Sequence, residues 1–365
     1  MSCDFFALAN AGIQGLSPYQ AGKPIEELQR ELGLSRVVKL ASNENPLGPS
    51  PLALAACDRA LRDFTRYPDA NGFELKQALS AKFGLAPEQL TLGSGSNDVL
   101  DLIGRVFLRP GVSAVFSQYG FIVYPIAVQA NGARAIVTPA KDWGHDLDAM
   151  AAAIEPDTRL VFIANPNNPT GTWLGHAALQ AFLRRVPENV VVVLDEAYTE
   201  YVERPDHPDA LALLREFPNL VVTRTFSKAY GLAGLRVGYS ISQPVIADLL
   251  NRVRAPFNVT SLGLAAAVAA LSDYDYLRRA RELNSAGMAQ LEQGLQRLGL
   301  GYIPSAGKFL AVEFGAESPA IYQKLLREGV IVRSVGVYAM PNHLRVSIGL
   351  PEENQFFLDA VAKVL

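Results

Sequence analysis

Three short apolar runs, each ending beside polar residues, limit most strongly what this chain can fold into. They cover residues 160–164, 190–194 and 220–226 and consist largely of Val, Leu, Ile and Phe. The first two runs are unbroken, which is typical of parallel strands buried on both faces, and the third is rich in β-branched residues. Helical patterns lie between them, so the sequence predicts an α/β fold with a mostly parallel sheet flanked by helices. In such folds ligands bind at the carboxyl ends of the strands.

The same alternation extends from about residue 50 to residue 255, and then it changes. After a long charged helix expected at 274–298, three short strands and two further helices indicate an α+β lobe. We therefore expect an arm of residues 1–38 that joins the small lobe, a large domain of 39–255 and a small domain of 256–365. Additional strands of the large domain are expected near 89–92, 114–117, 135–138 and 236–241, and helices near 72–83, 97–107, 119–131, 174–186 and 244–252.

Lys228 follows the third apolar run by two residues. Burial at a strand end disfavours the charged form of a lysine, lowers its pKa and makes the amine a nucleophile. Such an amine can hold an aldehyde as a Schiff base. The neighbouring Thr225, Ser227 and Arg236 are suited to binding a phosphate. An aldehyde and a phosphate on one small molecule point to pyridoxal phosphate, whereas the competing interpretation is a surface lysine at a strand end.

Two further strand ends carry side chains that suit the same cofactor. Asp195 beside a pyridine nitrogen would keep that nitrogen protonated, so that the ring acts as an electron sink. Tyr198 and Asn168 are placed to donate hydrogen bonds to the ring hydroxyl. Taken singly, an Asp or Asn here is more often a capping or turn residue. Three such strand ends in succession favour a shared site.

A glycine-containing turn, Gly95-Ser96-Asn97, lies between a predicted strand and a predicted helix. Backbone amides at a helix N-terminus bind phosphate through their geometry and the helix dipole. The motif alone is weak, but a nucleotide site would need a Gly-Lys-Ser/Thr sequence or a third glycine in phase. The sequence has neither, so we assign Gly95, Ser96 and Asn97 to the cofactor phosphate.

Bulk composition excludes several other classes of protein. A net charge of -3 and a pI near 5.9 argue against nucleic-acid binding, which requires a basic surface. The longest run of small apolar residues, 262–271, is too short to span a membrane. The four histidines lack metal-ligand spacing, so no metal site is expected. Two isolated cysteines, Cys3 and Cys57, and the lack of a signal-peptide pattern predict a cytoplasmic protein.

Several motifs together resemble a known family over nearly the whole chain. They are Leu40-Ala-Ser-Asn-Glu-Asn-Pro-Leu-Gly48, Arg66-Tyr-Pro-Asp69, Asn165-Pro-Asn-Asn-Pro-Thr-Gly171, Ser227-Lys228 and Leu344-Arg-Val-Ser-Ile-Gly349. They are similar to the fold-type I pyridoxal-phosphate aminotransferases and, more narrowly, to the histidinol-phosphate aminotransferases. One departure is Gly93-Ser-Gly-Ser-Asn-Asp98, where the family commonly has Gly-Asn-Gly-Ser-Asp-Glu. This puts the side-chain contact of Asn97 in question, but hardly affects binding by backbone amides.

The resemblance implies a reaction and an assembly. Lys228 would act as general base and then acid while an amino group passes between L-histidinol phosphate and 2-oxoglutarate, in a ping-pong reaction of histidine biosynthesis. The enzyme would be a homodimer in which Tyr67 reaches the cofactor phosphate of the neighbouring subunit. Tyr119 would lie against the face of the cofactor ring.

The resemblance also implies how substrates are chosen. Arg345 would accept either the glutamate carboxylate or the substrate phosphate, as the geometry of arginine favours. Arg333 and Tyr19 would assist with the phosphate, and Asn43 would border the substrate. A broad-specificity aromatic aminotransferase and a threonine-phosphate decarboxylase-like enzyme remain alternatives. A ligand-sensing regulator would need a DNA-binding module, and the first 38 residues are too short for one.

Overall fold

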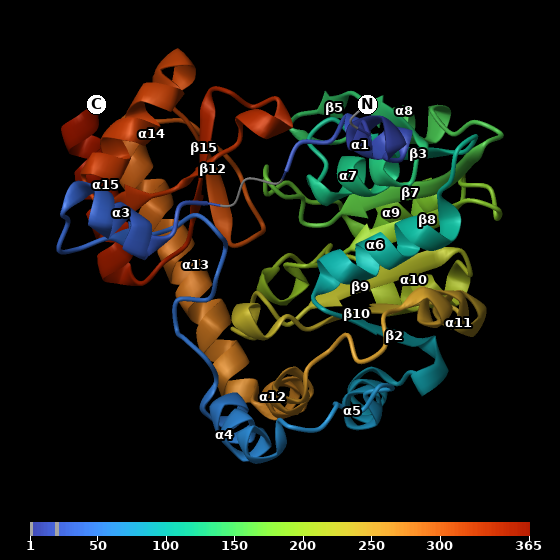
Figure 1. The fold of residues 1–365 in the computed structure, drawn as a ribbon. Coiled ribbons are helices and arrows are strands. Elements are labelled where there is room, and N and C mark those ends of the chain that lie inside the picture. The colour runs from blue at the N-terminus through green and yellow to red at the C-terminus, as the bar shows by residue number, and fades with distance from the viewer. Residues whose placement is uncertain (1–2, 19–21) are drawn as a thin grey trace.

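The computed structural model describes residues 3–18 and 22–365, and it divides into two lobes (Figure 1). The large lobe is built on a seven-stranded sheet in which β10 runs antiparallel to both neighbours and the other pairs are parallel. The predicted α/β class with a mostly parallel sheet is confirmed. In spatial order the strands are β2 (Leu90–Gly93), β10 (Gly238–Ile241), β9 (Leu220–Thr225), β8 (Val191–Asp195), β7 (Thr158–Ala164), β3 (Ser113–Ser117) and β4 (Arg134–Thr138).

Both faces of this sheet are buried, which explains the unbroken apolar runs. In β8, Val192 and Leu194 pack into one hydrophobic core, whereas Val191 and Val193 pack into a second core on the opposite face. The first core is completed by α5 (Phe73–Phe83), α8 (Leu147–Ala152), α9 (His176–Leu183), α10 (Ala210–Glu216) and α12 (Ser261–Ser272). The second is completed by α6 (Ser96–Phe107), α7 (Val123–Ala130) and α11 (Pro244–Val253).

The small lobe is an antiparallel sheet covered by helices, and it begins after the long α13 (Tyr274–Arg297). Its strands lie in the order β11 (Tyr302–Ile303), β12 (Phe309–Glu313), β15 (His343–Ser347) and β14 (Arg333–Ser334). Helices α14 (Ser318–Arg327) and α15 (Pro351–Val364) contribute to its core. The predicted α+β character of this lobe is confirmed.

In two places, residues assigned to different predicted domains pack against each other. Near the N-terminus, β1 (Val38–Lys39) pairs in parallel with β13 (Val330–Ile331), and α3 (Ile25–Leu32) packs against the same region through Leu28. Helix α12 packs on α4 (Pro51–Ala60) and belongs to the core of the large lobe. Residues 261–272 therefore pack with the large lobe, although they follow the predicted boundary between residues 255 and 256.

Residues 40–48, which we call the crossover segment, lead from β1 toward α4 and contact both lobes. At one end, Leu40 forms backbone hydrogen bonds with Ile331 and Ser347 of the small lobe. At the other, the Asn45 amide donates to the carbonyl of Ala229, next to Lys228. The segment therefore brings its own side chains between the lobes.

The remaining elements are short. They are α1 (Phe5–Leu8), α2 (Ala11–Gln14) and the two-stranded hairpin of β5 (Ala140–Lys141) and β6 (Gly144–His145). Within the described ranges no helix combines the length and apolar character needed to cross a bilayer.

Candidate active site

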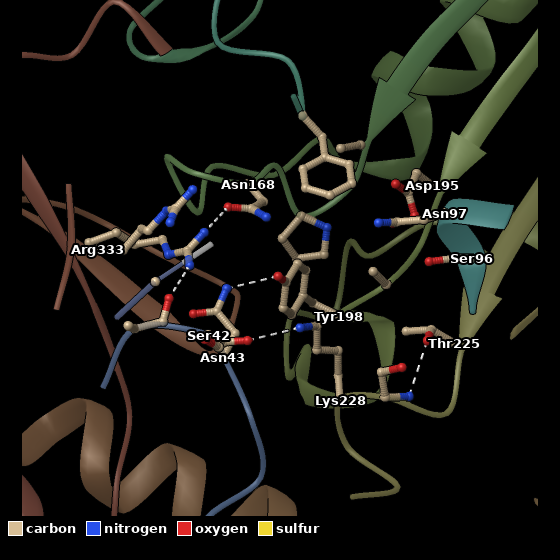
Figure 2. A pocket seen from close by; sticks show the side chains of 18 of the residues that line it. Ser42, Asn43, Ser96, Asn97, Asn168, Asp195, Tyr198, Thr225, Lys228 and Arg333 are labelled. Atoms are coloured by element: carbon tan, nitrogen blue, oxygen red, sulfur yellow. Dashed lines mark hydrogen bonds between the residues drawn. The ribbon is translucent and has the colours of Figure 1, made fainter. Parts of the chain in front are cut away.

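A cavity of about 190 Å³ opens at the carboxyl ends of β7, β8 and β9, between the large lobe and the small lobe (Figure 2). A volume of this size accommodates many water molecules and hence a small organic ligand. Twelve of the residues predicted for the site line it. They are Asn43, Ser96, Asn97, Asn168, Asp195, Tyr198, Thr225, Ser227, Lys228, Arg236, Arg333 and Arg345.

Lys228 extends from the loop after β9 into this cavity. Its Nζ donates a hydrogen bond to the carbonyl oxygen of Ser42 at 3.1 Å. Burial, and then the positive charge of Arg345, lower the pKa of Lys228 to about 8. Roughly a tenth of the amine is therefore uncharged at pH 7, far more than for an ordinary lysine, and the uncharged form is the one that a nucleophile or proton acceptor requires.

Asp195 ends β8 and is buried, with its carboxylate at the opposite side of the cavity from the small lobe. One carboxylate oxygen accepts from the Tyr124 hydroxyl at 3.0 Å and the other from the Thr223 hydroxyl at 3.1 Å. Within the described residues no cation forms an ion pair with it, and burial raises the pKa of Asp195 to about 6. A cationic ring nitrogen in the cavity would supply the missing positive charge and keep the carboxylate ionised.

Polar groups gather around the N-terminus of α6 and form a cup suited to an anion. Ser96 and Asn97 occupy the first turn of this twelve-residue helix. Opposite them, the Ser227 amide donates to Thr225 Oγ1 and Arg236 Nη1 donates to Ser227 Oγ, at 3.1 and 3.2 Å. Helix amides, two hydroxyls and a guanidinium together favour a phosphate.

Gly95 is required for this cup to close. Its φ is +84°, and a Cβ at this position would lie 2.4 Å from Arg236 Nη2. The glycine lets the backbone approach the guanidinium in a conformation that other residues rarely adopt.

The loop after β7 presents Asn168 toward the small lobe. Its Oδ1 accepts a hydrogen bond of 2.6 Å from Arg345 Nη1, and Arg345 Nη2 donates to the carbonyl of Ala41, also at 2.6 Å. Because Asn168 Oδ1 is engaged by Arg345, its NH₂ group remains the donor that can face a ligand. The predicted role of Asn168 at a ring oxygen fits this orientation.

Arg333 and Arg345 stand directly opposite each other on the paired strands β14 and β15. Both line the cavity. Like charges at facing positions of a sheet are unfavourable unless an anion or another group compensates them. The pair therefore forms a second cationic wall, separate from the phosphate cup around Arg236.

Two predicted site residues, Tyr119 and Tyr67, lie elsewhere, and a third cannot be placed. Tyr119 does not line the cavity; its ring lies 5.2 Å from the ring of Trp143, and Phe121 is the side chain from this segment that lines the wall. The two-residue shift follows from the turn before α7, which starts only at Val123. Tyr67 is 81% exposed and stacks on Phe257, and Tyr19 falls outside the described residues.

Several residues that the sequence did not single out support the site. Tyr124 holds Asp195, Ser347 contacts Asn43, and Tyr338 lines the cavity. Lys308 is 2% exposed, and its Nζ donates to the carbonyl of Ile348 at 2.6 Å. Tyr124, Ser347 and Tyr338 carried no local signal, because each owes its place to contacts between distant segments. For Lys308, a lysine directly before an apolar strand was the one available hint.

Comparisons with known proteins agree with this geometry. The family described as aminotransferase class I and II matches residues 35–361. The chain belongs to this aminotransferase family. A relative named histidinol-phosphate aminotransferase 2, from Pseudomonas fluorescens, is 62% identical over 100% of this chain and 99% of its own length. Its namesake from Pseudomonas aeruginosa is 61% identical, with 99% of both chains covered.

Solved structures also resemble the aminotransferase. Histidinol-phosphate aminotransferase from Sinorhizobium meliloti, in complex with pyridoxal-5'-phosphate, has a TM-score of 0.90 and 33% identity, covering 97% of this chain and 96% of that one. An aspartate aminotransferase from Thermus thermophilus has a TM-score of 0.85 at 22% identity and shows the shared fold.

The residues of the aminotransferase fit pyridoxal phosphate group by group. The cup at α6 suits its phosphate, and the buried Asp195 carboxylate suits its ring nitrogen. Lys228, with its lowered pKa, suits its aldehyde, and Asn168 and Tyr198 offer donors for its ring oxygen. These four groups line one cavity, as a single cofactor requires.

Proposed function

We propose that this chain is a histidinol-phosphate aminotransferase that uses pyridoxal phosphate. It transfers the amino group of L-histidinol phosphate to 2-oxoglutarate, giving imidazole-acetol phosphate and L-glutamate in histidine biosynthesis. The observation that carries the proposal is the pair of cationic walls, one at Arg236 and one at Arg333 and Arg345. The first takes the cofactor phosphate, so the second remains for an anionic group of each substrate.

When bound, pyridoxal phosphate supplies an aldehyde that accepts the amino group and a ring that delocalises negative charge. Asp195 holds the proton on the ring nitrogen, and Tyr124 and Thr223 hold Asp195 in place. Lys228 Nζ accepts the proton from the amine-bearing carbon of the substrate and later returns a proton, first as general base and then as general acid. Its lowered pKa allows both steps near neutral pH.

Arg345 orients the substrate by binding the carboxylate of glutamate or the phosphate of histidinol phosphate. Its contacts with Asn168 and Ala41 hold the guanidinium plane in place. Arg333, and Tyr19 by the family resemblance, would add to phosphate binding, and Asn43 would border the substrate. Phe121 is our candidate for the cofactor ring face, in place of Tyr119.

We further propose a cytoplasmic homodimer. Tyr67 and Phe257 form a stacked pair 4.6 Å apart on the surface, with exposed Phe64 and Phe73 in the same segment of chain. Such exposed aromatic groups favour a subunit interface. There Tyr67 would reach the phosphate of the neighbouring subunit's cofactor. Free cysteines at positions 3 and 57 suit a reducing compartment.

The test is a panel of amino donors and keto acceptors with purified enzyme. We expect kcat/KM for histidinol phosphate to exceed that for phenylalanine by roughly 100-fold. Phenylalanine has no phosphate group that could bind to Arg333 and Arg345. Equal values would indicate a broad aromatic aminotransferase. Carbon dioxide release without keto-acid formation would indicate a decarboxylase. Borohydride reduction followed by mass spectrometry should find the cofactor attached to Lys228.

A further inference from the structure

Asn43 occupies an unusual place in the crossover segment. It is 1% exposed, and its φ is +56°, in the left-handed region that non-glycine residues seldom adopt. Residues held in such conformations tend to cluster at functional sites, where surrounding contacts fix them. Here the contacts are hydrogen bonds to one residue of each lobe.

On the small-lobe side, Asn43 forms two hydrogen bonds with Ser347 at the end of β15. The backbone N–H of Asn43 donates to Ser347 Oγ at 2.9 Å, and Ser347 Oγ donates to the side-chain oxygen Asn43 Oδ1 at 2.7 Å. Reversing the side-chain amide would place its NH₂ group against the Ser347 hydroxyl hydrogen. That hydrogen would then be buried without an acceptor, at a cost comparable to a lost hydrogen bond. Ser347 therefore fixes which end of the Asn43 amide faces the large lobe.

On the large-lobe side, Asn43 Nδ2 donates to the Tyr198 hydroxyl oxygen at 2.8 Å (Figure 2). Since an NH₂ group cannot accept, the hydrogen of the Tyr198 hydroxyl must point elsewhere. Within the described residues this hydroxyl makes no other hydrogen bond, and Tyr198 lines the cavity. Its hydrogen is therefore available to a ligand.

We propose that Ser347 is a positioning residue which, through Asn43, sets the Tyr198 hydroxyl as a donor into the cavity. We call this chain of groups the Ser347–Asn43–Tyr198 relay. The inference rests on the proposed function, because the group that would accept from Tyr198 is the ring oxygen of the cofactor. It adds that the small lobe determines the polarity of a donor on the large lobe.

The surroundings of Tyr198 are consistent with a donor that stays protonated. Burial raises the pKa of Tyr198 to about 12. The charged and titratable groups around it are Arg345, Tyr338 and Asp195, and Lys228 Nζ lies 5.8 Å from its ring centroid. The orientation of its hydrogen therefore depends on the neutral Asn43 amide.

The test compares Ser347→Ala with Ser347→Thr, which keeps the hydroxyl, and with Tyr198→Phe, which removes the donor. The holoenzymes are titrated with pH by visible absorbance, and cofactor dissociation constants are measured by protein fluorescence. A hydrogen bond donated to the ring oxygen favours the more negative form, so its loss moves the absorbance midpoint to higher pH. We expect a shift of about one pH unit for Tyr198→Phe and roughly half of that for Ser347→Ala.

The double variant Ser347→Ala/Tyr198→Phe should shift no further than Tyr198→Phe alone, because Ser347 acts only through the tyrosine. Ser347→Thr should restore the wild-type midpoint. If Ser347→Ala does not fold, Asn43→Asp replaces it, since a carboxylate accepts from Tyr198 and turns its hydrogen away from the cavity. The charge of that variant is controlled by repeating the substitution in the Tyr198→Phe background.

The outcomes separate this inference from the proposed function. A wild-type midpoint in Ser347→Ala, or full additivity in the double variant, would overturn the relay while leaving the aminotransferase assignment intact. A wild-type protein that shows no visible band with pyridoxal phosphate, or an unshifted Tyr198→Phe variant, would instead overturn the proposed role of the cofactor site.

Discussion

The two walls of the active-site cavity are held in place by different means. On the large-lobe side, Asp195 and Lys228 follow directly from the ends of neighbouring strands, so the sheet itself sets their positions. On the small-lobe side, Asn43 and Arg345 come from segments about three hundred residues apart. Side-chain hydrogen bonds of Ser347 to Asn43 and of Arg345 to Ala41 join these two segments. We infer that the large-lobe wall, which we call the chemical wall, supplies the groups that hold and move protons. The small-lobe wall, which we call the orienting wall, orients ligands and positions groups of the chemical wall.

The largest expected effect tests the chemical wall at its centre. Lys228→Ala should lower kcat by about four orders of magnitude, because it removes the group that accepts and returns the proton. Steady-state kinetics with histidinol phosphate measures this loss. Lys308→Met is the matched control, since Lys308 does not line the cavity and should retain most of the activity. Equal losses in the two variants would show that the effect does not depend on a lysine inside the cavity, and would remove the assignment of Lys228 to the chemical wall.

The next effect tests whether the opposite end of the same wall acts electrostatically. Asp195→Asn keeps the shape but removes the charge, and we expect kcat to fall by about 10²- to 10³-fold. Cofactor affinity, measured by fluorescence, should fall less because the phosphate cup is unchanged. Tyr124→Phe, which removes only one hydrogen bond to Asp195, should give a smaller loss. A kcat near the wild-type value in Asp195→Asn would contradict the assigned role.

A smaller effect is expected at the orienting wall. Arg345→Lys keeps the charge but loses the two-pronged geometry that contacts Asn168 and Ala41. We expect kcat/KM to fall about 100-fold for both substrates. For Arg333→Lys we expect kcat/KM to fall only about tenfold, because lysine keeps the positive charge beside Arg345. If Arg345→Lys lowered kcat alone, with KM unchanged, Arg345 would belong to the chemical wall instead.

The smallest effect concerns Lys308, a buried lysine of the small lobe. Burial, and then the charge of Lys228, lower the pKa of Lys308 to about 7. The unfolded chain therefore binds more protons than the folded protein from about pH 7 up to the ordinary lysine pKa, and the contribution of Lys308 to stability is lost as the pH falls through this window. Relative to Lys308→Met, the wild-type apoprotein should lose about 3 kcal/mol of unfolding free energy between pH 9.5 and pH 7.

Urea unfolding of both apoproteins at the two pH values measures this difference. Lys308→Met removes the titrating amine together with its coupling to Lys228, and the ionisable groups away from these two lysines serve as an internal control. An unchanged difference between the two pH values would show that Lys308 titrates normally, and that its burial has no electrostatic cost.

The large lobe was the more predictable part of the molecule. Its strands are confirmed within a few residues, because burial of both sheet faces leaves continuous apolar runs. Helices α4, α8 and α10 were not predicted; α8 and α10 have only six and seven residues, and α4 packs mainly on α12 through small alanine side chains. The displacement of Tyr119 by Phe121 depends on a turn whose exit angle local sequence does not define.

The small-lobe wall was less predictable for a physical reason. The arginines carried a charge signal, but Ser347 and Lys308 matter through partners far along the chain. No local pattern encodes a hydrogen bond between residues 43 and 347, or the pairing of β1 with β13. The catalytic and binding roles assigned to individual residues stay predictions that the variants above address.

The pairing of β1 with β13 has a consequence for how the protein is made. The strands of the large sheet lie between residues 90 and 241, so on the ribosome they can assemble while the chain is still growing. Residues 38–48 emerge much earlier, yet their partners at 330–331 and 345–347 are among the last to be synthesised. Closing so long a loop is slow. The nascent enzyme thus carries an assembled sheet and an unfinished catalytic pocket until translation is nearly complete.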